Sequence, residues 1–510
     1  MDPTSIDSNK QTCASALFLG MFLSVLAGCA RLGEAPGPSA PALPTAMNIH
    51  AGRTVTLRQQ PETLYQEDED GPVISLDALI EAVLRHNPEL QADLAFHEGR
   101  LQRIPQEISL PDPSAQLKIA RSSGGTVEEA RFGLDPAAPP KKVGMSSAVA
   151  YTLQIMQPLP WPEKLRLKGR IAAHEAAIAF ETHNIRLLDT IRGLSRAYYA
   201  LAFEHASLAL TREEKRYLEQ YIETTAAGYA VGRHGRQALL KAQTEMARLD
   251  NEILGFPGRI ESLRAELRAA VGDLDAADAL LNTGQVMPID QLDAPLPEVG
   301  PREMLAEAMR LLPEAAQLER QIELGQLRKA LAREDYRPDF SVGIEYMNSA
   351  ASTMGMGASG RRDTVGLMAG FTIPVPNARR RAQLAEARLI EREARLRKQA
   401  LEVNTAAALE AAFERMHSLA ERILVYDDSL MPLAYETYET SRAEYETGIG
   451  DYLNMLDALR TMIDLRHEQL RLKRDYLLLL ADVQRIVGAR FVFHATPFDE
   501  ETLTEEASHE

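Results

Sequence analysis

The sequence predicts a mixed α and β protein in which long coiled-coil helices predominate and four short strands form two hairpins. Three observations support this fold class. Apolar residues recur at coiled-coil spacing, four short segments alternate apolar and polar residues, and a set of landmarks occurs twice in the same order. A repeat of this kind indicates that the fold is built twice from one unit.

The repeat is defined by landmark pairs at nearly constant offsets of 225, 227, 216 and 216 residues. The pairs are Pro88-Glu89 with Pro313-Glu314, Pro111-Asp112 with Pro338-Asp339, Pro158 with Pro374, and Tyr229-x-x-Gly232 with Tyr445-x-x-Gly448. The smaller later offset places one insertion between the second and third landmarks. Each copy therefore reads helix, strand, loop, strand, long helix, joint and helix.

These landmarks divide the chain into segments with expected boundaries. The segments are a signal peptide (1–28), a lipidated Pro-rich tether (29–73), a first repeat (74–300) that ends in a linker (272–300), a second repeat (301–488) and an acidic tail (489–510). We expect strands at 114–121, 148–157, 339–347 and 364–373, and long helices at 162–228, 237–271, 378–445 and 451–487.

Period-two alternation gives each expected strand one apolar face and one mixed face. The apolar positions are Ala115, Leu117 and Ile119; Val149, Tyr151, Leu153 and Ile155; Phe340, Val342, Ile344 and Tyr346; and Val365, Leu367, Ala369, Phe371 and Ile373. The pattern fits either a half-buried sheet or a lipid-facing barrel wall. Because a membrane barrel needs about eight strands or more, membrane-spanning strands would have to be pooled from several chains.

The helix that begins at Pro162 meets no further proline or turn cluster until about Gly228. Within it, apolar residues at alternating spacings of four and three form a coiled-coil seam. The seam is Leu187, Ile191, Leu194, Tyr198, Leu201, His205 and Leu208. His205, the polar exception, is interpreted as a packed histidine or, alternatively, as a metal ligand, although no second ligand lies four residues on.

The amino terminus carries an uncharged apolar run that ends in Leu26-Ala27-Gly28-Cys29. The run is typical of a signal peptide, with a single transmembrane anchor as the alternative. Its last four residues resemble the lipobox of bacterial lipoproteins, which implies lipidation of Cys29. The leading MDPTSIDSNK departs from the pattern, since it holds two Asp and one Lys. After cleavage Cys29 would be the sole cysteine, so no intramolecular disulfide is expected.

Composition excludes several classes of function. A formal charge of −17 without a basic face argues against nucleic-acid binding. Residues 355–360 match G-x-G-x-x-G, but a strand follows them where a dinucleotide site needs a helix. No catalytic constellation or metal-ligand cluster stands out, so neither an enzyme nor a cofactor is expected.

Several of these features together resemble the outer membrane efflux protein family, the TolC-like exit ducts of bacterial export pumps. They are PLPWPEKLRLKG after a strand, LPDPS and RPDFS before the first strand of each copy, the doubled Tyr-x-x-Gly joints and the lipobox. The resemblance covers residues 74 to 488. It implies a homotrimer in which four strands per chain close a twelve-stranded transmembrane barrel above a long α-helical barrel. The implied location is the bacterial outer membrane, lipid-anchored and extending into the periplasm.

The resemblance also implies partners and a gate. The partners would be a periplasmic adaptor (membrane fusion) protein, an inner-membrane pump of the resistance-nodulation-division type, and outer membrane lipid. The gate would lie at the two joints, at the periplasmic tip, and comprise Tyr229, Gly232, Arg233, Arg236, Tyr445, Gly448, Asp451, Asn454 and Asp457. The acidic positions of the family fall on Asn454 and Asp457, with Asp451 close enough to substitute for the amide. The alternative is that these are solvated turn charges.

The sequence leaves two alternatives for the cargo and two for the class of function. PWPEKLRLKG is most similar to the branch that serves heavy-metal pumps, and Met347, Met354, Met356 and Met368 are candidate soft-metal contacts or ordinary filler. Heavy-metal cations or drugs are therefore the expected cargo. The alternative function is a periplasmic coiled-coil scaffold or adaptor lipoprotein whose strands form a small soluble sheet.

Overall fold

The computed structural model describes most of the chain between residues 67 and 488. The described residues are 67–68, 71–122, 126–128, 142–144, 148–230, 236–283, 285–286, 289, 300–351, 360–447, 449–450 and 452–488. The signal peptide, Cys29, Met354, Met356 and the acidic tail lie outside them. The chain divides into a sheet unit, which holds Gly99–Glu175 and Ile322–Arg392, and a helical unit, which holds Met47–Glu98, Ala176–Gln321 and Glu393–Glu510. Each unit takes segments from both predicted repeats.

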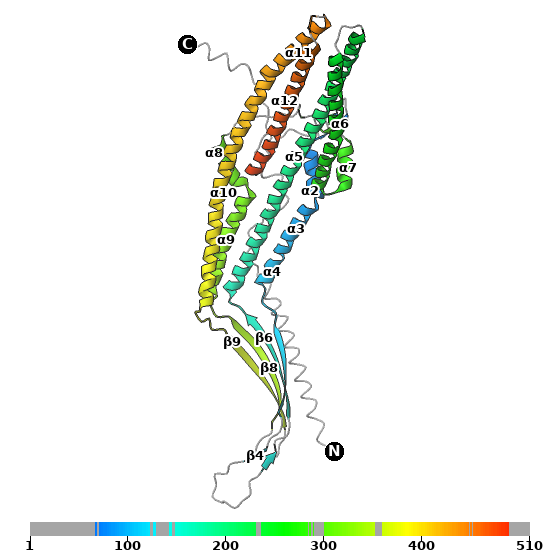
Figure 1. Cartoon of the computed structure of the whole chain (residues 1–510). Helices are drawn as coiled ribbons and strands as arrows, with labels where there is room; N and C mark the ends of the chain where they lie inside the picture. Colours follow the sequence, from blue (N-terminus) through cyan, green and yellow to red (C-terminus); the bar gives the residue numbers. More distant parts are fainter. Residues whose placement is uncertain are drawn as a thin grey trace, which may run out of the picture. The chain divides into compact units, whose positions relative to one another are not determined.

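The sheet unit contains a four-stranded antiparallel sheet in the order β3-β6-β8-β9 (Figure 1). Its strands are β3 (Ser114–Ser122), β6 (Ala148–Leu159), β8 (Phe340–Ala351) and β9 (Gly360–Phe371). The register aligns Leu117, Leu153, Tyr346 and Val365 in one row across all four strands. A separate pair, β4 (Thr126–Glu128) with β5 (Lys142–Gly144), was not expected from the sequence.

One face of this sheet is apolar and solvent-exposed in the single chain. Leu367 is 87% exposed, and Ile119 and Val365 are 64% and 58% exposed. Because successive side chains alternate between faces, the register collects polar and small residues on the other face, among them Gln154, Glu345 and Gly366. Within the sheet unit, none of the strand residues whose burial is described is buried, which does not favour the half-buried alternative.

A buried ion pair fixes the junction between the strands and the long helix α5 (Pro162–Ala230). The Lys164 ammonium, 9% exposed, donates to both carboxylate oxygens of Asp339 at 2.9 Å and to the carbonyl of Arg337 at 3.0 Å. The Trp161 backbone N–H also donates to Asp339, at 2.9 Å. Burial raises the pKa of Asp339, but the Lys164 and Trp161 hydrogen bonds outweigh it, so this pKa lies below its ordinary value.

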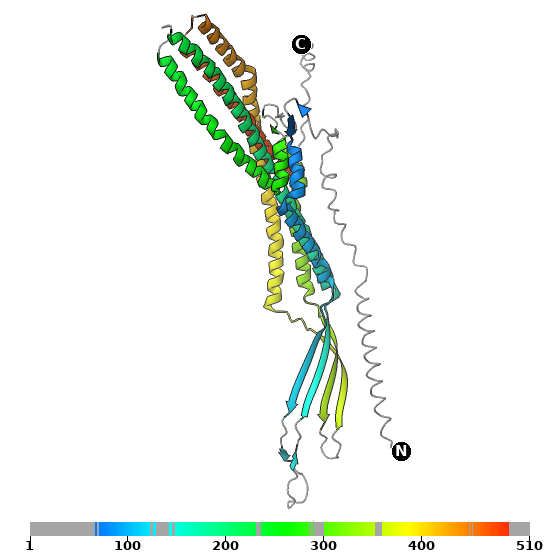
Figure 2. The same ribbon diagram turned by 90° about the vertical axis from the view of Figure 1, so that its right-hand side faces the viewer.

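Ten further α-helices lie among the described residues. They are α2 (Leu76–His86), α3 (Pro88–Leu101), α4 (Arg103–Ile108), α6 (Arg236–Val271), α7 (Leu274–Thr283), α8 (Pro301–Leu311), α9 (Pro313–Glu334), α10 (Ala378–Val425), α11 (Met431–Glu446) and α12 (Tyr452–Val487). Figures 1 and 2 show the long helices α5, α6 and α12 extended within the helical unit. None of the helices in the described part of the chain is apolar enough over a sufficient length to cross a membrane.

The predicted coiled-coil seam of α5 packs into the main core of the helical unit. Leu194 and Leu201 are fully buried and Tyr198 is 2% exposed, with its hydroxyl donating to the carbonyl of Ile74 at 2.9 Å. His205 is only partly buried, and no described group of metal-ligating side chains includes it.

The segment expected as a linker, 272–300, contains regular structure, which corrects the prediction. Gly272, at φ +80°, ends α6, and the carboxylate of Asp273 accepts the N–H groups of Asp275 and Ala276 to begin α7. The strand β7 (Gln285–Val286) then pairs in parallel with β2 (Gly71–Ile74), which itself pairs with β1 (Glu67–Asp68). The end of the expected tether is therefore also a strand.

The helix expected over 378–445 is interrupted, which is a second correction. A π-helical turn at Tyr426–Leu430 separates α10 from α11, and the Met431 N–H bonds to the carbonyl of Tyr426. Pro432 explains the interruption, because it has no N–H and its ring clashes with the carbonyl four residues before it. A π turn accommodates the extra residue without ending the helical path.

Replacing Lys164 by Met should destabilise the sheet unit, because Asp339 would keep its charge in a partly buried position without its partner. Full burial of such a pair would cost about 3–5 kcal/mol. Since Asp339 is 39% exposed, we expect about 2 kcal/mol, measured as a lower denaturation midpoint in detergent. The double variant Lys164→Met with Asp339→Leu should recover part of this loss. Equal midpoints for Lys164→Met and the wild type would show that the Lys164–Asp339 ion pair does not stabilise the sheet unit.

Candidate functional site

Five of the nine predicted gate residues lie among the described residues of the helical unit. Tyr229 is in the last turn of α5, Arg236 opens α6, Tyr445 lies near the end of α11, and Asn454 and Asp457 are in the first turns of α12. Gly232, Arg233, Gly448 and Asp451 lie outside the described residues.

The structure brings three of these residues together around one hollow between α6 and α12. Arg236, Asn454 and Asp457 line a space of about 790 Å³, together with Glu245 and Arg460. Its other lining residues are Gln237, Leu240, Lys241, Thr244, Leu453 and Leu456. Asn454 and Asp457 are exposed. The hollow therefore presents both basic and acidic side chains near the first turns of α6 and α12.

Neither predicted tyrosine lines this hollow. Tyr229 is 46% exposed on α5. Tyr445 is half-buried and packs against a small apolar cluster formed by Leu218, Ala242, Leu249, Met455 and Leu456. Tyr445 thus packs against residues of α12, among them Leu456, which itself lines the hollow.

The joint after α11 is closed by backbone hydrogen bonds. The carbonyl of Glu444 accepts the N–H groups of Ile449 and Gly450, at 3.0 and 2.9 Å. A Cβ added at Gly450 would lie 2.9 Å from the Cβ of Glu444 and 3.1 Å from the Tyr445 nitrogen. Glycine at 450 therefore allows the chain to return this closely over the end of α11.

Polar contacts that the sequence did not reveal link the helices beside the hollow. Glu245 of α6 pairs with Arg460 of α12 at 3.4 Å and with Arg248 at 3.3 Å. The hydroxyls of Tyr221 (α5) and Tyr438 (α11) are 2.5 Å apart. The partners on different elements are separated by more than two hundred residues, so no local motif identifies them.

A carboxylate with an unusual pKa lies close to this network. Burial, followed by the charges of Glu245, Asp464 and Glu252, raises the pKa of Glu214 to about 7, against a smaller opposing effect of Arg248. Glu214 comes from α5, and its neighbours come from α6 and α12. The ionisation of one side chain is thus coupled to the packing of three helices.

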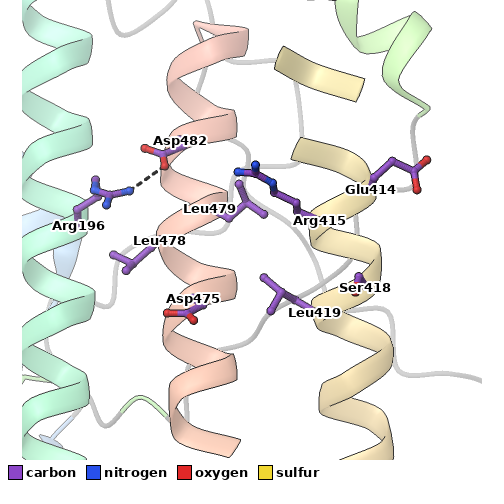
Figure 3. Close-up of a pocket in the computed structure, with 9 residues that line it drawn as sticks. All are labelled: Arg196, Glu414, Arg415, Ser418, Leu419, Asp475, Leu478, Leu479 and Asp482. Carbon is purple, nitrogen blue, oxygen red and sulfur yellow. Dashed lines mark hydrogen bonds and ion pairs between the residues drawn. The ribbon is translucent and has the colours of Figure 1, made fainter. Parts of the chain in front are cut away.

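A second hollow, of about 560 Å³, lies on the surface formed by α10 and α12 (Figure 3). Leu419, Leu478 and Leu479 contribute its apolar part, and an ion pair of 2.7 Å between Arg196 of α5 and Asp482 lies at its edge. It contains none of the predicted gate residues.

Side chains suited to a resident metal do not gather in the part of the chain that the structure describes. No group of three or more His, Cys, Asp or Glu residues there is arranged to hold a metal ion. Of the candidate methionines, Met368 accepts a hydrogen bond from the Gln154 amide at 3.4 Å. Met347 pairs in register with Thr364 rather than with Met368.

The raised pKa of Glu214 predicts a pH-dependent stability. The protonated form is favoured in the folded state, so its stabilising effect is complete below about pH 4.5 and is lost as the pH rises through about 7. Glu214→Gln should therefore melt at a higher temperature than the wild type at pH 8.5 and at the same temperature at about pH 4.5. Thermal circular dichroism in detergent measures this. Glu223→Gln, an exposed carboxylate on α5, is the control, and a pH-independent difference between Glu214→Gln and the wild type would contradict the coupling.

Comparison with known proteins finds one family model that matches part of the chain. The family model "Outer membrane efflux protein" matches residues 79–273. No curated protein sequence matches the chain.

Several solved outer membrane channels share the fold. The structure of CusC superimposes with a TM-score of 0.65 at 16% identity, covering 85% of this chain and 99% of that one. The open-state MtrE channel of Neisseria gonorrhoeae gives 0.64 at 15% identity, covering 85% and 97%. VceC of Vibrio cholerae gives 0.59 at 18% identity, covering 82% and 97%. Over residues 79–273 the chain is thus similar to the outer membrane efflux protein family, and over most of its length it shares the fold of these solved channels.

Proposed function

We propose that this protein is the outer membrane exit duct of a tripartite efflux pump, assembled as a homotrimer. The observation that carries the proposal is the open sheet. β3 and β9 each have one edge without a partner strand among the described residues, and the apolar face is exposed. Strands of 9 to 12 residues match the roughly 9–11 residues that a tilted strand needs to cross a bilayer. Three copies would supply twelve strands, an even number within the known range.

The helices support assembly of several copies independently of the strands. On α6 the exposed residues Leu240, Ala247 and Leu254 recur every seven positions. On α10 the exposed Leu396 and Val403 are also seven positions apart, and Ala400 and Ala407 beside them are exposed. Seven-residue apolar spacing is typical of a helix that packs against another helix. Each seam lacks a cover in the single chain, and a neighbouring copy would provide it.

In such a trimer the joints would form the gate. Threefold symmetry would place three copies of Asp457, and of Asp451, around a narrow axis, where close like charges raise pKa values and attract cations. Arg233 and Arg236 would pair with Asp451 between hairpins and hold the closed state. Three gate positions already line one hollow, which supports this arrangement.

The remaining assignments complete the proposal. Cys29 would carry the lipid anchor in the outer membrane, and the helical unit would extend into the periplasm. There it would meet a periplasmic adaptor and an inner-membrane pump of the resistance-nodulation-division type. Heavy-metal cations or drugs would be the cargo. Sensitivity of a deletion strain to a panel of metal salts and drugs would separate these two.

The two faces of β6 provide a matched test of the barrel. Leu153 lies on the exposed apolar face and Gln154, its neighbour, on the polar face. Arginine facing lipid near the bilayer centre costs about 2–4 kcal/mol. Leu153→Arg should therefore strongly reduce outer membrane assembly, whereas Gln154→Arg should assemble normally, as measured by detergent extraction and trimer yield.

The same fractionation separates the duct from a coiled-coil scaffold. A duct stays in the membrane fraction as a trimer even as Cys29→Ser, because its strands hold it there. If Cys29→Ser is entirely soluble and monomeric, the duct proposal is wrong and the scaffold lipoprotein is favoured.

The acidic gate predicts a change in conductance. In planar bilayers, Asp451→Ala with Asp457→Ala should weaken block by divalent cations and raise the open probability, because the ring of carboxylates that binds cations is removed. The matched control is Asp428→Ala, an exposed carboxylate in the π-helical turn before α11. Unchanged block and open probability in the double variant would show that these are solvated turn charges.

A further inference from the structure

A third hollow in the helical unit combines a basic rim with an apolar wall. It has a volume of about 880 Å³ and lies between α5, α6 and α12, beside β2 and β7. Leu201, Leu208, Leu281 and Val286 contribute to its wall. Its basic side chains are Arg212, Arg216, Arg264, Arg466 and Lys473. Glu213 is the one carboxylate among the described residues that line it.

Most of these cations have no carboxylate partner among the residues that the structure describes. Glu213 forms an ion pair with Arg466, with 3.3 Å between the charged atoms. Within the described ranges, no carboxylate lies within ion-pair distance of the other four basic residues of the hollow. Arg264 and Lys473 are partly buried, so they are not simply solvated surface charges.

On two of these helices, α5 and α12, the other cations of the helical unit are in ion pairs. Along the helical-unit part of α5, Arg186, Arg192, Arg196 and Lys215 are all in ion pairs. On α12, Arg460, Arg471, Arg474 and Arg485 are as well. On α5 and α12 within the helical unit, the cations without an ion pair among the described residues are therefore those that line this hollow.

His205 adds a neutral polar group to the hollow. Burial and the nearby charge of Arg264 lower its pKa, against a smaller raising effect of Glu204, whose carboxylate is already paired with Arg259 at 2.7 Å. The imidazole at this position therefore offers a hydrogen bond rather than a further charge at neutral pH. The histidine of the predicted seam thus has a place in this hollow.

We propose that this hollow binds an organic anion that carries two or more carboxylate or phosphate groups together with an apolar part. The cations come from three helices, so one charged group cannot reach them all, and the volume exceeds the needs of a single inorganic ion. Arginine suits both carboxylate and phosphate because its guanidinium donates two parallel hydrogen bonds. The apolar wall would cover the hydrocarbon part. This site is independent of the duct proposal, since it lies within one chain.

Titration calorimetry on the purified full chain tests this with three probes: citrate, pyrophosphate and benzene-1,3,5-tricarboxylate. We expect saturable binding that weakens with salt, tightest for the aromatic tricarboxylate. Arg264→Gln with Lys473→Gln should weaken it by about tenfold or more, because two charge-assisted hydrogen bonds to the anion are lost. Arg471→Gln, a basic residue of α12 outside the hollow, should bind like the wild type. Circular dichroism verifies that each variant is folded.

Three results would overturn the proposal. One is that no probe binds, and another is that Arg471→Gln loses affinity as much as the double variant. The third is binding that appears only after removal of residues 489–510, because the acidic tail of the chain would then be the natural occupant. None of these results bears on channel conductance, so the site and the duct proposal fail separately.

Discussion

The constraint on which the rest of the structure depends is that the four-stranded sheet is incomplete within one chain. Backbone groups at the outer edges of β3 and β9 need partners, and an apolar face with Leu367 almost fully exposed needs an apolar surrounding. Neither need is met by the described helices. The exposed heptad residues of α6 and α10 impose the same requirement on the helices. Strands and helices therefore call for additional copies for separate physical reasons.

Stability is distributed unevenly over the helical unit. Its main core combines α2, α5, α6, α7, α8, α10 and α12 into one large apolar cluster. Near the joints, the described residues form two small apolar clusters, one around Leu218 and Met455 and the other around Tyr438 and Met462. Polar contacts such as Tyr221–Tyr438 add to them. A region with few buried apolar contacts opens at a lower cost than a large core, which suits a part of the molecule that is proposed to move.

The sequence predicted the regular elements well because their signals are periodic. The strand around Leu153 alternates and the helix from Pro162 has an uninterrupted heptad seam, and both occur within two residues of their expected limits. The break at Tyr426–Leu430 was missed because Pro432 is compatible with either a kink or a first-turn position. Helix α7 was missed because it is short and begins at a capping aspartate, Asp273.

The candidate site was less predictable, because its chemistry comes from residues far apart in the sequence. Repeat landmarks led to Tyr445, and the family resemblance led from it to Asp457. The structure places Asp457 on the hollow with Arg236 and Asn454. Glu245 and Arg460, which join α6 to α12 there, have no local signature. Their pairing depends on how two helices separated by two hundred residues are aligned, and this alignment is determined by packing rather than by short-range pattern.

Some charges near the joints interact within one chain, and others would interact only between copies of the chain. The neighbours that raise the pKa of Glu214 all belong to the same chain, so its protonation changes even in an isolated copy. Asp457 is exposed in the single chain, and it would face other copies of itself only when chains meet around an axis. Glu245 connects these two groups of charges, because it lines the hollow with Asp457 and also raises the pKa of Glu214. Under the proposed function, a change in pH near neutrality would therefore reach the gate through the packing of α5, α6 and α12.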